Sequence, residues 1–154
     1  MRTIQMLVPE MPMTDEERRK YLDSLDKSLL KGGVILSGWC TFIIQEADIA
    51  FTNGAYLASI LTAVSGIETY LRSEYTRSDK DRLFKLIEGA PLDASLKEDL
   101  HVLRKYRNNW VHVEEPWQDR ELERTSETLM AELEEMSLFA VCVLRRTIYE
   151  NQWI

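Results

Sequence analysis

Near the end of a helical stretch, the residues RNNWVH bring together three side chains whose types suit proton transfer and phosphate binding. His112 can give and take a proton because histidine titrates near neutral pH. Arg107 carries a permanent charge on a planar fork that matches a phosphate group, and Asn108 can donate to an oxygen atom or orient the imidazole. Asn108 and His112 share a helical face that begins roughly 100° from Arg107. The three can therefore border one groove if the helix end loosens before Pro116.

One residue of this set also interrupts an apolar stripe on its helix. Because successive side chains are about 100° apart around a helix, the side chain of Arg107 points to the same side as the leucines before it. Glu68 occupies the equivalent position in a second apolar stripe. The first stripe contains Leu96, Leu100, Leu103, Arg107 and Trp110, and the second contains Leu57, Leu61, Val64, Glu68 and Leu71. A charge that leaves water without a partner costs several kcal/mol. We therefore expect Glu68 and Arg107 to be neighbours, either as a buried ion pair that fixes helix register or around a shared opening where both stay partly hydrated.

The overall composition limits the class of protein. A chain of 154 residues with 45% hydrophobic content can bury a core without disulfides or metal ions, so one domain is expected. The net charge of −7 is the wrong sign for a protein whose whole surface attracts nucleic acid. Any contact with RNA must therefore be local, and Arg72, Arg104 and Lys105 are the candidate basic residues for it, the alternative being that they belong to a solvated helical surface.

Cysteine usage and apolar segments indicate the compartment. Cys40 and Cys142 both lie in apolar helical runs, which suits core residues in a reducing compartment such as the cytoplasm. Residues 1–13 lack the charged region followed by a continuous apolar region that defines a signal peptide, so we expect an N-terminal extension there. The longest apolar stretch, VILSGWCTFIIQEADIAF, contains two carboxylates and an amide and is not expected to span a membrane.

Capping patterns and apolar periodicity predict the helices that must position these residues. The expected ranges are 14–30, 34–51, 55–75, 79–89, a fifth from Asp93 or Ser95 to about Pro116, and 118–149. In the last helix, apolar residues recur at seven-residue spacing from Leu122 to Val143, a seam long enough to pack along a bundle or a partner. The expected fold is an all-α, up-and-down bundle of about five to six helices, in which residues 14–154 form one domain.

The order of arginine, asparagine, three further residues and histidine near the end of a late helix resembles the RNxxxH form of the R-x(4–6)-H motif of HEPN domains. The stretch ILTAVSGIETYLRSEY resembles the family's helix with an acidic residue inside an apolar run, which corresponds to Glu68, and GWCTFIIQEADIAF is similar to its early helix. The resemblance covers about residues 34–150. It implies a HEPN-like bundle that forms a homodimer, with the motifs of both chains facing each other across the two-fold axis.

The resemblance also implies an activity. Many HEPN domains are metal-independent endoribonucleases, so Arg107, Asn108 and His112 are the expected catalytic residues, with Glu68 in support. The same resemblance implies that the chain is a toxin or defence component that binds RNA, and that an antitoxin or regulatory protein is its partner. One departure concerns control of the activity. Family members paired with a nucleotidyltransferase antitoxin carry a modified tyrosine two positions after the histidine, and Glu114 stands there in this chain.

Two other functions stay open from the sequence. One is a catalytically silent HEPN-like dimer that binds a nucleotide or a partner protein, which the acidic net charge favours, whereas the complete set of arginine, asparagine and histidine favours an enzyme. The other is a helical adaptor in which RNNWVH only packs. Neither a metal nor another cofactor is expected, because two histidines eleven positions apart and two distant cysteines have no metal-ligand spacing. His101, on the outer side of its helix, is expected to be a cap or a surface residue.

Overall fold

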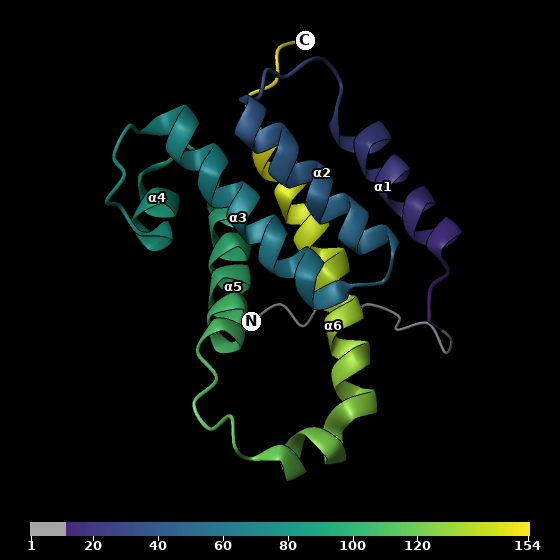
Figure 1. Ribbon diagram of the computed structural model, residues 1–154. Helices are drawn as coiled ribbons and strands as arrows, with labels where there is room; N and C mark the ends of the chain where they lie inside the picture. Colours follow the sequence, from purple (N-terminus) through teal and green to yellow (C-terminus); the bar gives the residue numbers. More distant parts are fainter. Residues whose placement is uncertain (1–11) are drawn as a thin grey trace.

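The computed structural model describes residues 12–154, except for the side chains of residues 121 and 123–125, and within this range the chain forms six α-helices (Figure 1). This confirms the predicted all-α bundle. Most of the predicted N-terminal extension, residues 1–11, lies outside the described residues. The helices are α1 (Asp15–Leu29), α2 (Gly38–Thr52), α3 (Tyr56–Tyr75), α4 (Leu83–Gly89), α5 (Ala94–Val111) and α6 (Asp119–Ile148).

Local capping interactions set the helix starts. The side chain of Thr14 accepts a hydrogen bond from the backbone N–H of Glu17, and the Glu17 carboxylate accepts one from the backbone of Thr14, so the predicted capping box is confirmed. Asp93 caps α5, which is the first of the two starts that the sequence allowed. The prediction that α2 begins near residue 34 is wrong, because Ser37 caps the helix and residues 34–37 lie outside it.

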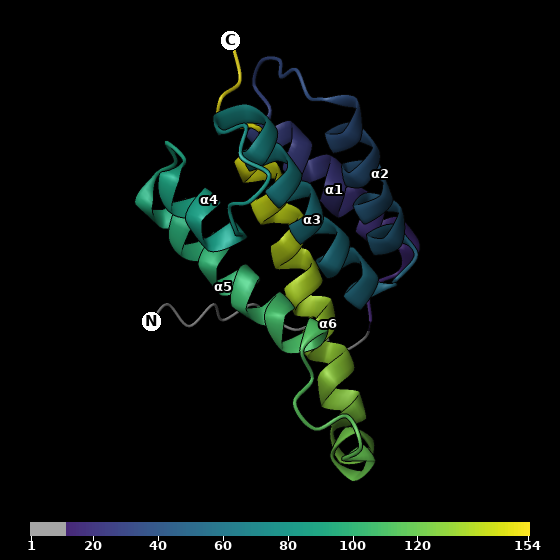
Figure 2. The same cartoon turned by 60° about the vertical axis from the view of Figure 1, so that its left-hand side comes forward.

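The helices pack in two groups around α3. Figures 1 and 2 show α2 and α3 side by side, and in Figure 1 α6 lies behind them. Helix α1 packs against α2 and α6. Helices α4 and α5 lie on the side of α3 that faces away from α1. Gly66 sits where α2, α3 and α6 meet, and a Cβ atom there would lie 3.4 Å from Ile43 and 3.5 Å from Leu144. The position therefore leaves little space for a larger side chain. Among the described residues, no helix has both the length and the apolar character needed to cross a lipid bilayer.

A buried arginine joins three helices. Arg145 on α6 is 3% exposed, and its guanidinium donates to both carboxylate oxygens of Asp48 on α2, at 3.0 and 2.7 Å. Its Nε donates to Asp26 on α1 at 2.9 Å, and the same carboxylate oxygen accepts a hydrogen bond from the Tyr149 hydroxyl at 2.7 Å. Burial alone would lower the pKa of Arg145, but Asp48 and Asp26 raise it overall. Arg145 is therefore held in its charged form.

The first part of α6 extends beyond the rest of the bundle (Figure 2). Only part of the predicted apolar seam of α6 is therefore covered by the other helices. Leu133 and Val143 are buried in the core, and Leu129 and Met136 pack against it, but Leu122 is exposed. Residues 111–120, which lead from the end of α5 into α6, are exposed as well. The bundle therefore covers the seam from residue 129 onward and leaves its beginning uncovered.

The Arg145 network predicts a large effect of a small change on α2. We expect Asp48→Asn to lower the free energy of unfolding by about 2–3 kcal/mol, because a buried guanidinium loses its two-oxygen partner. Glu46→Gln, which changes an exposed carboxylate on the same helix, should stay within about 0.5 kcal/mol of the wild type. Urea unfolding of the three proteins measures the difference, and equal stabilities would contradict the role given to Arg145.

Candidate functional site

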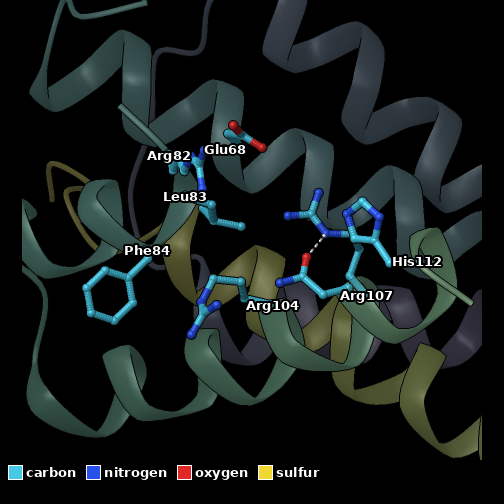
Figure 3. Close-up of a pocket in the computed structure, with 8 residues that line it drawn as sticks. Glu68, Arg82, Leu83, Phe84, Arg104, Arg107 and His112 are labelled. Atoms are coloured by element: carbon cyan, nitrogen blue, oxygen red, sulfur yellow. Dashed lines mark hydrogen bonds between the residues drawn. The ribbon is translucent and has the colours of Figure 1, made fainter. Parts of the chain in front are cut away.

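The RNNWVH motif forms one end of a pocket between α3, α4 and α5 (Figure 3). Its volume of about 570 Å³ falls within the range of roughly 300–1,000 Å³ that is typical of small-molecule sites. The lining residues are Glu68 from α3, Arg82, Leu83 and Phe84 from the start of α4, and Arg104, Arg107, Asn108 and His112 from α5 and its end. All three expected catalytic residues and Glu68 thus border the same cavity.

Arg107 and Asn108 are joined directly. The Nε atom of Arg107 donates a hydrogen bond of 3.0 Å to Oδ1 of Asn108, drawn as the dashed line in Figure 3. This contact uses the side of the guanidinium, not its two terminal amino groups, and it turns the amide oxygen of Asn108 toward the arginine. The amide NH₂ group of Asn108 is the part that can donate to a ligand. The pair therefore offers donors to a phosphate group or another anion.

His112 lies at the point where α5 ends. Its backbone N–H still donates to the carbonyl oxygen of Asn108 at 3.0 Å, but its φ of −131° and ψ of 64° take the chain out of the helix. Helix α5 therefore ends before Pro116, which is the condition that lets the three motif side chains border one groove. His112 is exposed and lines the pocket, so a ligand in the pocket can reach its imidazole.

Glu68 and Arg107 share the pocket without being each other's nearest charged partner. The Glu68 carboxylate lies 3.2 Å from the guanidinium of Arg72, one turn further along α3. Glu68 and Arg107 are both only partly buried. Of the two predicted arrangements, the shared opening describes the structure and the buried ion pair does not. The physical reason is that each charge has a closer hydrogen-bonding partner on its own helix.

Of the three basic residues expected to contact RNA, the structure places Arg104 in the pocket and the other two outside its lining. Arg72 donates to the carbonyl oxygens of Ser78 and Asp81, at 3.1 and 2.8 Å, in addition to its contact with Glu68. It therefore holds the segment between α3 and α4. Lys105 is exposed on another face of α5.

The contribution of α4 to the pocket was not predicted. Arg82, Leu83 and Phe84 line it although the motif lies more than twenty positions later in the sequence. Arg82 is one of five basic residues between positions 72 and 85, and this enrichment was the only signal in the sequence. Sequence periodicity shows which face of a helix is apolar and not which helix lies beside it. The position of these three residues depends on how α4 packs beside α5.

The expectation that His101 is a cap or a plain surface residue is wrong. Its Nε2 atom lies 2.6 Å from Oε1 of Glu88, and its ring packs on Phe84 with centroids 5.1 Å apart. Its side chain is 19% exposed. The outer side of α5 is covered because α4 packs there, which sequence spacing on α5 alone does not reveal.

Because Glu68 and Arg107 border an opening and do not form an ion pair, their charges should contribute little to stability. We expect Glu68→Gln and Arg107→Gln each to change the free energy of unfolding by less than about 1 kcal/mol, and the double mutant to show additive effects within about 0.5 kcal/mol. Chemical unfolding of the four proteins gives the coupling energy. A coupling well above that value would mean that the two side chains pair directly in solution.

Comparisons with known proteins add no assignment to this geometry. Within the part of the chain that the structure describes, no group of three or more histidine, cysteine, aspartate or glutamate side chains is placed to hold a metal ion. The chain matches no protein-family model, no curated protein sequence and no solved structure.

Proposed function

We propose that this chain is a metal-independent endoribonuclease of the HEPN type, which cleaves single-stranded RNA and serves as a toxin or defence component. The observation that carries the proposal is that Arg107, Asn108 and His112 line one pocket that is open to solvent. A proton carrier, an amide and a fixed cation meet there, and RNA cleavage by internal attack uses proton transfer and positive charge on the phosphoryl oxygens.

In this reaction the ribose 2′-oxygen attacks the adjacent phosphorus atom while a base removes its proton. The bond from phosphorus to the 5′-oxygen of the next nucleotide breaks, and an acid protonates that oxygen, which leaves a 2′,3′-cyclic phosphate and a 5′-hydroxyl. His112 transfers protons. Arg107 stabilises the charge that gathers on the phosphoryl oxygens, and Asn108 donates to one of these oxygens or orients the imidazole.

The charge around the pocket favours an anionic ligand despite the acidic protein. Arg82, Arg104 and Arg107 line the cavity, and the one carboxylate in the lining, Glu68, is paired with Arg72. A cleft lined by charges of one sign concentrates the electric field there. The pocket can thus attract a phosphodiester while the net charge of −7 repels nucleic acid from the rest of the surface.

A second copy of the chain supplies what one motif lacks. One chain brings a single motif histidine, whereas the reaction uses both a base and an acid. Apolar side chains that are 48–71% exposed flank His112 in the sequence and continue into α6. We call this set of residues the apolar elbow, and it comprises Val111, Val113, Trp117, Leu122 and Met130. Exposed apolar surface is typical of protein interfaces, so this segment is the part of the chain that we propose for the dimer contact. Trp110, which packs partly against the core, lies beside the elbow.

A catalytically silent module that binds a nucleotide is the second candidate. It is favoured by the pocket volume, which suits a single small ligand, and by the acidic net charge. The two functions differ in whether RNA is cut. If the dimer forms and neither the wild type nor any variant cleaves RNA, nucleotide binding in the same pocket becomes the function to measure.

The nuclease proposal predicts cleavage of single-stranded RNA that persists in EDTA and yields 2′,3′-cyclic phosphate ends. DNA should be spared because it lacks the 2′-hydroxyl. His112→Ala should lower the rate by roughly 10²- to 10⁴-fold, and Arg107→Ala by a comparable factor. Lys20→Ala, which removes an exposed lysine charge on α1 outside the pocket, is the control and should cleave normally. Equal cleavage by the wild type and His112→Ala would assign the activity to another site or a contaminant.

The dimer proposal predicts a two-fold dimer at micromolar concentration, measured by light scattering. Trp117→Glu should shift the protein toward the monomer and reduce cleavage, because it places a charge in the apolar elbow. Trp39→Glu changes an equally exposed tryptophan on α2, far from the motif in the sequence, and should leave the dimer intact. A monomeric wild type, or a dimer that Trp117→Glu does not weaken, would remove the composite site.

A further inference from the structure

We infer that Phe84 is a stacking platform for an unpaired base of the bound RNA, and that Arg104 binds the phosphate of the same nucleotide. The inference rests on the proposed function in taking RNA as the ligand, but it assigns residues outside the motif. It names a subsite at the end of the pocket opposite His112 (Figure 3).

Phe84 is the apolar residue of α4 that the fold does not bury. Leu83, Leu86 and Ile87 of the same short helix are at most 5% exposed, whereas Phe84 is 54% exposed and lines the pocket. A ring that stays largely in water contributes little to the core. Single exposed apolar residues are common on proteins, so exposure alone would decide nothing. What suggests a ligand is that this ring lies at one end of a pocket whose lining also includes three arginines.

Arg104 is fixed beside that ring. The central carbon of its guanidinium lies 5.2 Å from the centroid of Phe84, and its Nε donates to Nδ1 of His101 at 3.3 Å. Because Nδ1 accepts this bond, the proton of a neutral His101 is on Nε2, which faces Glu88 at 2.6 Å. Among the described residues, the two terminal amino groups of Arg104 make no hydrogen bond. They can therefore bind a phosphate without giving up an existing contact.

The chemistry of these two side chains selects a class of ligand. An aromatic ring stacks on any base, but only if the base is free of its neighbours in a helix, and an arginine next to the ring binds the backbone. His101 and Arg104 both approach Phe84 from α5, and more than half of the residue stays exposed for such a contact. The subsite would thus accept single-stranded RNA and reject duplex RNA, whose bases are stacked and paired.

Binding of a short fluorescein-labelled 2′-O-methyl RNA, measured by fluorescence anisotropy, tests the subsite without cleavage because this RNA lacks the nucleophile. We expect Phe84→Leu to weaken binding by roughly 5- to 150-fold and Phe84→Trp to retain it, since stacking needs a ring. Phe42→Leu changes a similarly exposed phenylalanine on α2 and should have no effect. Arg104→Ala should remove about one phosphate contact, which reduces the slope of the logarithm of the binding constant against the logarithm of the salt concentration by about 0.7. Phe84→Leu should leave this slope unchanged.

An RNA of the same length with abasic sugars separates stacking from other effects of the mutation. Wild type should bind it more weakly, and Phe84→Leu should cause no further loss. Three results would overturn the subsite. Wild type and Phe84→Leu could bind normal RNA equally well, Phe84→Leu could weaken binding of the abasic RNA as much as that of normal RNA, or the wild type could fail to bind. Cleavage assays separate the two proposals. If Phe84→Leu cleaves RNA with an unchanged KM, the subsite proposal is wrong and the nuclease proposal stands. If binding depends on Phe84 but no RNA is cleaved, the nuclease proposal is wrong and the subsite is supported.

Discussion

The burial of a guanidinium group at Arg145 is the constraint on which the arrangement of the helices depends. A charge in the core needs carboxylates at fixed positions, and Asp26 and Asp48 provide them from α1 and α2. The next residue, Arg146, lies 2.6 Å from Asp99 on α5. Two consecutive arginines of α6 thus bind helices on opposite sides, one linking α6 to α1 and α2 and the other linking it to the helix that carries the motif.

The arginines of the pocket differ from Arg145 in how many of their donors the protein uses. Arg145 donates to two carboxylates and is enclosed, so nothing else can reach it. Arg104 and Arg107 are only partly buried, and each donates from Nε to a side chain close by on α5. Such a contact holds the guanidinium in place and, among the described residues, leaves its two terminal amino groups without a hydrogen bond. Charge that serves folding and charge that can serve binding are therefore found at separate places in the molecule.

Local sequence rules predicted most of the scaffold and part of the site. Caps such as Thr14 and Asp93 and the apolar stripes are properties of one helix at a time, and they predicted the six helices. Besides the start of α2, two bounds differ, because α4 begins at Leu83 and not at residue 79, and α5 ends at Val111 and not near Pro116. The start of α2 was missed because Ser37 caps an otherwise apolar run. The surroundings of His101 and the place of Phe84 depend on how α4 packs on α5, and no spacing within one helix contains that information.

The projecting first part of α6 has a consequence for how activity would depend on the amount of protein. Those turns extend past the core, and Leu122 and Met130 remain exposed there (Figure 2). Short helical segments without tertiary contacts are only marginally stable in water. If a second copy covers them, the ordering of this segment and the assembly of the composite site become one mass-action event. Well below the dissociation constant, the concentration of active sites would then rise with the square of the protein concentration, so that expression level itself would act as a threshold.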